Sequence, residues 1–278
     1  MRAVWVLCAL VSASAPAAAD ERTFEFLGGH GCTVSEDTRD ALANAGFLKP
    51  YTNAILDDAL ARGVAERQGD YIVLDDSICT IRLPDIQSRW SVNDPEIEAM
   101  APYIREEYTI GDMTYVDEGC FFRAGMDGFV ALNGGDVEAG YRDYMQFMAA
   151  AIISGEVRMY SDNPLRTPPG LQLLSGNCAD LPNIDDIRRS HDVLVASFGD
   201  WVRASQAVSV CGDYREYGDP MFPIRAQGVD PMGDEDAQPA INALLGIEWM
   251  LITVGAGWRD GDRSDDKGVA RPPLCHVE

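Results

Sequence analysis

The clearest pattern of hydrophobic and polar positions runs from Pro182 to Cys211. Apolar residues recur there every three or four positions, which is the spacing of one face of an α-helix. Asn183 stands at the expected N-cap, and acidic residues follow it in the first turn, where the helix dipole favours them. We therefore predict a helix of about 26 residues, about 39 Å long. Its core-facing stripe consists of Ile184, Ile187, His191, Leu194, Val195, Phe198, Trp201, Val202, Ser205 and Val208.

Two further segments have strong helical patterns. Residues 137–154 place apolar side chains on one face and end before Gly155. Residues 240–258 are apolar almost throughout, but Asn242 and Glu248 interrupt them. Because a charged side chain in the middle of a bilayer is costly, we interpret the second segment as a buried core helix and expect no membrane span in the mature chain.

Shorter signals between residue 20 and about residue 90 predict a small module bounded by Cys32 and Cys79. Its expected elements are a strand at Thr23–Leu27, a helix opened by Thr33 and Glu36 and ended by Gly46, a helix from Pro50 to Gly63, and a hairpin of Val64–Arg67 with Tyr71–Leu74. This order is helix–helix–hairpin and winged-helix-like.

Beyond this module the patterns predict a larger, mainly helical domain. Its expected elements are a linker at Leu83–Asn93, a helix opened by Asp94 and Pro95 that continues to Tyr108, a short hairpin of Met113–Val116 with Cys120–Arg123, the helices above, and irregular segments at 160–183, 212–236 and 259–278. The fold class predicted is α+β, mainly helical, divided into 1–19, 20–90 and 91–278.

The N-terminus has the pattern of a secretory signal. Arg2 precedes a short apolar run, and Ala17 and Ala19 form a small-residue cleavage site before Asp20. We therefore expect a signal peptide over residues 1–19 and a periplasmic or secreted product.

Six cysteines remain after that cleavage, an even number in an exported chain, which is typical of disulfide bonds. Their positions at the two ends of one module predict a bond between Cys32 and Cys79. The other four pair among themselves, and three connectivities stay open for Cys120, Cys178, Cys211 and Cys275. No pair has the C-x-x-C spacing of zinc or thioredoxin-type sites.

The charge excludes several partners. Without the signal, 21 basic side chains face 45 acidic ones, a net charge near −24, which disfavours nucleic acid and anionic lipid. The winged-helix-like module is itself acidic and therefore unsuited to DNA. Asp260, Asp262, Ser264 and Asp266 alternate like calcium ligands, but Asp265 and Arg271 occupy the decisive Gly and carboxylate positions. We predict no metal site and no cofactor.

Catalytic motifs are absent from the sequence, which has no G-x-S-x-G and no H-E-x-x-H. The candidates left are His191 and Glu248, the two polar residues on the most apolar helices. A buried carboxylate needs a partner, and His191, Asn242, an arginine or a tyrosine hydroxyl could serve. Both residues could instead be satisfied locally as part of the core.

Two function classes are compatible with these observations. The first is a non-catalytic exported protein that binds another protein of the cell envelope, favoured by the absence of a catalytic constellation. The alternative is a secreted hydrolase that uses acidic residues in a groove between the two domains, because glycan cleavage requires only two suitably placed carboxylates.

Overall fold

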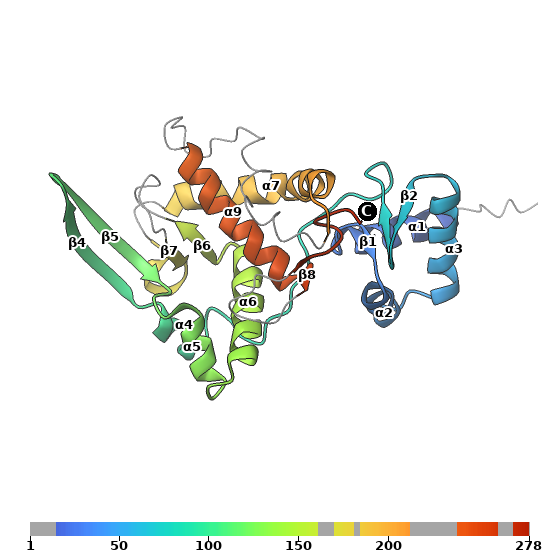
Figure 1. Ribbon diagram of the computed structural model, residues 1–278. Helices are drawn as coiled ribbons and strands as arrows, with labels where there is room; N and C mark the ends of the chain where they lie inside the picture. The colour runs from blue at the N-terminus through green and yellow to red at the C-terminus, as the bar shows by residue number, and fades with distance from the viewer. Residues whose placement is uncertain (1–14, 161–169, 181–183, 212–237, 261–268, 278) are drawn as a thin grey trace, which may run out of the picture.

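The chain folds into helices and antiparallel sheets, and a long β-hairpin projects from one end (Figure 1). This computed structural model describes residues 15–160, 170–180, 184–211, 238–260 and 269–277. About half of them are helical and 18% lie in strands. Residues 1–14 of the expected signal peptide 1–19, the N-cap Asn183, the irregular segment 212–236 and residues 261–268 lie outside the described residues.

The N-terminal part combines three helices with a three-stranded sheet. Its elements are α1 Ala15–Gly28, β1 Thr33–Val34, α2 Glu36–Asn44, α3 Lys49–Ala61, β2 Ala65–Gln68 and β3 Tyr71–Leu74. The central strand is β3, which pairs antiparallel with both β1 and β2. Ser35 caps α2 by accepting a hydrogen bond from the Thr38 amide, and Pro50 lies in the first turn of α3.

The larger part is built from a four-stranded sheet and longer helices. Its elements are α4 Pro95–Met100, β4 Tyr103–Ile110, β5 Met113–Phe121, α5 Gly125–Leu132, α6 Val137–Ile153, β6 Val157–Tyr160, β7 Gly170–Leu173, the 3₁₀ turn Gly176–Cys178, α7 Ile184–Val208, α9 Gln238–Gly255, β8 Arg259–Asp260 and β9 Val269–Ala270. The strand order of its main sheet is β4-β5-β7-β6, and β8 pairs with β9.

The core of the larger part lies where α6, α7 and α9 meet β6 (Figure 1). Gly255 on α9 lies so close to α6 that a Cβ there would stand 2.4 Å from that of Ala149. Trp201 of α7 and Trp249 of α9 are fully buried, and burial of a large apolar side chain contributes about 1.5–3 kcal/mol. The same cluster of buried side chains includes Leu27 and Leu56 of the N-terminal part. The predicted division near residue 90 stays a prediction.

The three long helices confirm the helical patterns, with one correction to the stripe on α7. Leu194, Phe198 and Trp201 are buried as expected. Val195 and Val208, which the spacing placed in the stripe, are 45% and 57% exposed. The stripe is therefore narrower than predicted, since α7 lies at the surface and packs along one side only. The side chains of Ile184 and Ile187 are outside the described set.

The prediction of a mainly helical fold is wrong. The chain has a three-stranded and a four-stranded antiparallel sheet, where the patterns predicted two short hairpins. The N-terminal part is also not a simple helix–helix–hairpin unit, because β1 adds a third strand and residues 23–27, expected as a strand, belong to helix α1. The architecture is a mixed α+β fold.

The largest local error concerns residues 101–121. The predicted helix ends at Met100, since Pro102 disfavours helical backbone at Ala101. Ile104 and Tyr108 therefore lie in strand β4, and the turn falls at Gly111 and Asp112 instead of residues 117–119. Gly111 has a φ of 62°, which a glycine adopts readily.

The disulfide prediction is confirmed. Cys32 is bonded to Cys79, and the other four cysteines pair among themselves as Cys120–Cys178 and Cys211–Cys275. In the described residues, no helix is long and apolar enough to cross a membrane.

Candidate functional site

Glu248 forms a buried ion pair that joins α9 to β6. The Arg158 Nη2 atom lies 2.6 Å from Glu248 Oε2, and the two side chains are 1% and 0% exposed. Glu248 Oε1 also accepts a hydrogen bond of 2.7 Å from the Met159 amide. Burial raises the pKa of Glu248 to about 7, although the Arg158 charge opposes this shift. Of the partners left open by the sequence, an arginine is the one observed.

His191 lies on α7 and has a different partner. Its Nε2 atom is 3.0 Å from the carbonyl oxygen of Ile153 at the end of α6. Burial lowers the pKa of His191, while the Ile153 carbonyl opposes that shift. The hydrogen bonds and ion pairs of the described residues thus do not join His191 to Glu248. Glu248 is paired inside the core, and the half-buried His191 is hydrogen-bonded to backbone.

Another group of polar side chains surrounds a cavity between the two parts of the chain. A cleft of about 640 Å³ separates the β2–β3 hairpin from the C-terminal half of α7 and from the C-terminal tail. We call it the hairpin cleft. Its walls are residues 63–66, 68 and 73–76 of the hairpin, 203, 206 and 207 of α7, and 276 and 277 of the tail.

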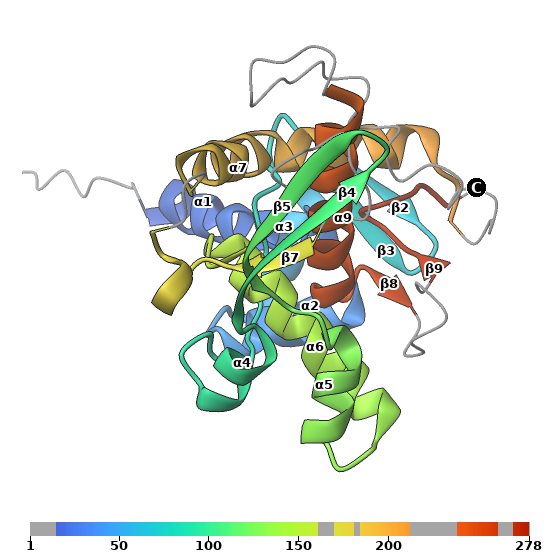
Figure 2. The ribbon, with the colours of Figure 1, turned by 90° about the vertical axis from the view of Figure 1, so that its left-hand side faces the viewer.

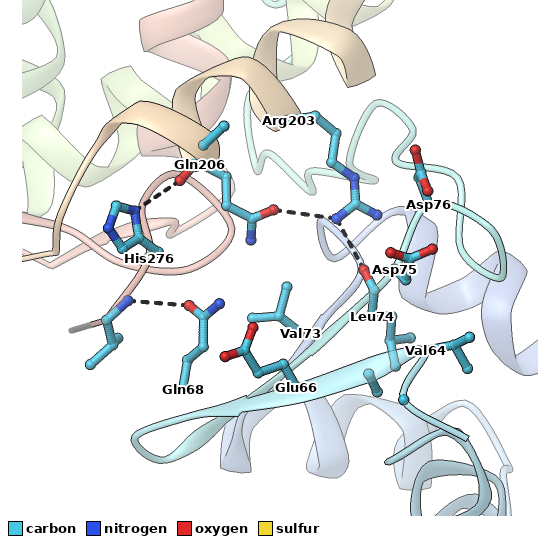
Figure 3. Close-up of a pocket in the computed structure, with 14 residues that line it drawn as sticks. Val64, Glu66, Gln68, Val73, Leu74, Asp75, Asp76, Arg203, Gln206 and His276 are labelled. Atoms are coloured by element: carbon cyan, nitrogen blue, oxygen red, sulfur yellow. Dashed lines mark hydrogen bonds between the residues drawn. The ribbon is translucent and has the colours of Figure 1, made fainter. Parts of the chain in front are cut away.

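Arg203 is the cationic group of the hairpin cleft. Its side chain reaches from α7 to the hairpin, with Gln206 on one side and Asp75 and Asp76 on the other (Figure 3). It donates to the carbonyl oxygens of Leu74, at 3.0 Å, and Cys79, at 3.1 Å. Two of its donors are therefore occupied by backbone, and the guanidinium fastens α7 to the end of β3.

A close approach of the backbone makes this reach possible. A Cβ at Gly199, one turn before Arg203, would stand 2.6 Å from the carbonyl oxygen of Ile81. Only glycine allows α7 to lie this close to the segment that follows Cys79. The sequence reasoning missed this site because it depends on such contacts between distant segments.

The C-terminal tail closes the other side of the cleft. His276 pairs with Val210 in a parallel bridge, and the Cys211 amide donates to the His276 carbonyl at 2.8 Å. The ring Nδ1 atom of His276 is 3.2 Å from the carbonyl oxygen of Gln206. The Val277 amide donates to Gln68 on β2. Since Cys275 is bonded to Cys211, the disulfide holds the tail at the end of α7.

The electrostatics of the cleft are acidic. Three exposed carboxylates, those of Glu66, Asp75 and Asp76, line it together with the single guanidinium of Arg203. Hydrogen bonds from Ser77 lower the pKa of Asp75, so its carboxyl stays charged at neutral pH. A charged carboxylate attracts cations and does not act as a proton donor. The cleft therefore favours a cationic ligand over acid catalysis.

Metal ligands do not gather in the described part of the chain, which has no group of three His, Cys, Asp or Glu side chains able to hold an ion. Comparison with family models, curated proteins and solved structures finds no match to this chain. The candidate site therefore rests on its own geometry. One pairing left open by the sequence pointed to part of this site. A bond between Cys211 and Cys275 places His276 beside the end of α7.

Proposed function

We propose that this protein is an exported, non-catalytic binding protein whose hairpin cleft receives a cationic side chain of another envelope protein. The observation that carries the proposal is the cleft itself, a cavity of about 640 Å³ with three carboxylates and one arginine. Arg203 is hydrogen-bonded to the backbone of Leu74 and Cys79 and interacts electrostatically with Asp75 and Asp76, but the three carboxylates outnumber this one guanidinium. A lysine or arginine side chain complements them.

Neutralising the cleft carboxylates is expected to weaken cation binding. The double variant Glu66→Gln/Asp76→Asn should bind a capped tetralysine peptide about tenfold more weakly than the wild type, since two attractive charges are lost. Isothermal titration calorimetry at low ionic strength measures the effect, and raising the salt to about 0.15 M should reduce it.

The matched control changes the same charge elsewhere. Asp57 on α3 and Glu138 on α6 are exposed and lie outside the cleft. The variant Asp57→Asn/Glu138→Gln should leave the affinity for tetralysine within about twofold of the wild type. Equal losses in the two double variants would mean that the peptide responds to net charge alone, and the cleft proposal would be abandoned.

A secreted hydrolase is the second candidate function. The observation in its favour is that acidic residues do line a groove between the two parts of the chain. Glycan hydrolysis, however, needs one carboxyl that stays protonated to act as general acid. The lowered pKa of Asp75 excludes it from that role at neutral pH. The binding function therefore takes precedence.

Export to the periplasm is part of the same proposal, and the three disulfide bonds support it because such bonds persist in oxidising compartments. We expect cleavage between Ala19 and Asp20 when the full chain is expressed with a functional export pathway. N-terminal sequencing or intact mass measurement of the product checks this. A mature protein that begins at Met1 would contradict it.

A further inference from the structure

The β4–β5 hairpin is an arm that projects from the body of the protein (Figures 1 and 2). Its strands of eight and nine residues pair along their whole length, from Tyr103 opposite Cys120 to Ile110 opposite Met113. Only Cys120 and Phe121, at its base, also pair with β7. The Cys120–Cys178 disulfide fixes the same end. Most of the arm therefore receives no support from the rest of the described chain.

The arm presents an open sheet edge. β4 is the outermost strand of its sheet, so along Tyr103–Ile110 one row of backbone N–H and C=O groups has no neighbouring strand among the described residues. A two-stranded hairpin is marginally stable by itself in water, and an open edge readily accepts a further strand. Met113, at the tip, is 61% exposed. These features are those of a surface for strand addition.

The charges on the arm indicate the chemistry of the added strand. Residues 103–121 contain five acidic side chains and one basic one, Arg105. The strand register places Glu106 directly opposite Asp117, and like charges at opposed positions destabilise a strand pair. The Arg105 guanidinium lies 3.6 Å from a carboxylate oxygen of Glu118 and 3.8 Å from one of Glu107. One cation is therefore shared between two carboxylates.

One cation at the base compensates part of this charge. Arg123 lies 2.6 Å from Glu106. The strands still carry more carboxylates than cations, since Asp112 and Asp117 add to the acidic side. A basic strand placed along β4 would supply the missing positive charge.

We propose that the arm binds an extended basic segment of a partner protein, which adds to the open edge of β4 as a further strand. Main-chain hydrogen bonds supply the docking, and basic side chains of the segment lie beside the exposed carboxylates Glu106 and Glu107 of β4. A second copy of this chain fits less well. Two β4 edges related by a two-fold axis would bring Glu106 and Glu107 of one copy against those of the other. The arm is distinct from the hairpin cleft, so this proposal stands or falls separately.

The test uses a capped eight-residue peptide of alternating lysine and valine, which matches the length of β4. We expect it to bind the full-length mature protein and to slow amide hydrogen exchange along residues 103–110. Asp117→Lys should weaken the affinity for the peptide about tenfold. The substitution removes a negative charge from the arm, and the new lysine pairs with Glu106 on the opposite strand. Asp117→Asn should have a smaller effect in the same direction.

The control is Asp57→Lys, which makes the same change of charge on α3, at the opposite end of the molecule from the arm (Figure 1). It should leave the affinity within about twofold. Equal weakening by Asp57→Lys and Asp117→Lys, or peptide binding without protection of β4, overturns the proposal. A dimer of the peptide-free protein with β4 protected would identify a second copy as the occupant and also overturn it.

Discussion

Replacing Glu248 with alanine is expected to lower the free energy of unfolding by about 3–5 kcal/mol, the largest effect we expect from any single substitution. The change removes the carboxylate that lies 2.6 Å from the buried Arg158 guanidinium. It also removes the acceptor of the Met159 amide. Chemical denaturation followed by circular dichroism measures the loss.

The control for this prediction replaces both charges. The double variant Arg158→Met/Glu248→Leu buries neither of the two charges. Because replacing a buried ion pair with apolar side chains often costs little stability, this variant should recover at least about half of the stability lost in Glu248→Ala. A loss below about 1 kcal/mol in Glu248→Ala would show that the pair contributes no more than an exposed one.

The same residue makes the stability of the protein depend on pH. Burial raises the pKa of Glu248 from 4.5 to about 7, so between these values the folded state holds a proton that the unfolded state releases. This contribution is therefore complete below pH 4.5 and is lost as the pH rises through about 7. Glu248→Gln cannot titrate, so the wild type should lose stability relative to it over this range. A difference in stability between the two proteins that stays constant with pH would contradict the raised pKa of Glu248.

The fold could be predicted from the sequence where one pattern dominated. The helices α6 and α7 carry long apolar stripes with helical spacing, and α9 is an apolar run of 18 residues, too long for an ordinary strand. The arm shows the opposite case. Ile97, Ile104 and Tyr108 continue a helical spacing, but Ile104, Tyr108 and Ile110 also occupy alternating positions of a strand. Pro102, which ends helical backbone before it, was the deciding signal.

The candidate site was predictable only in its parts. A carboxylate in the apolar segment 240–258 implied a buried partner, and an arginine was among those expected. Which arginine could not follow, because strand β6, which carries Arg158, was not predicted. The hairpin cleft is harder still, since Gln68 and Val277 meet across 209 positions. Contacts of this kind depend on tertiary packing, about which local periodicity says nothing.

Removing the Cys211–Cys275 bond is expected to lower both stability and binding. It closes a loop of 64 positions, and the chain-entropy estimate for such a loop gives about 4 kcal/mol. The variant Cys211→Ser/Cys275→Ser should therefore unfold at a lower denaturant concentration. Because the bond holds His276 and Val277 against the end of α7, tetralysine binding in the cleft should also weaken, by about tenfold.

The matched control is the bond between Cys120 and Cys178, which closes a loop of similar length, 58 positions. It lies at the base of the arm and takes no part in the walls of the cleft. Cys120→Ser/Cys178→Ser should lose about 4 kcal/mol as well, yet bind tetralysine like the wild type at a temperature where both variants are folded. If both variants lose binding equally, the effect is a general loosening of the fold. If only Cys211→Ser/Cys275→Ser loses it, the tail is a wall of the binding site, and its disulfide sets the width of the cleft.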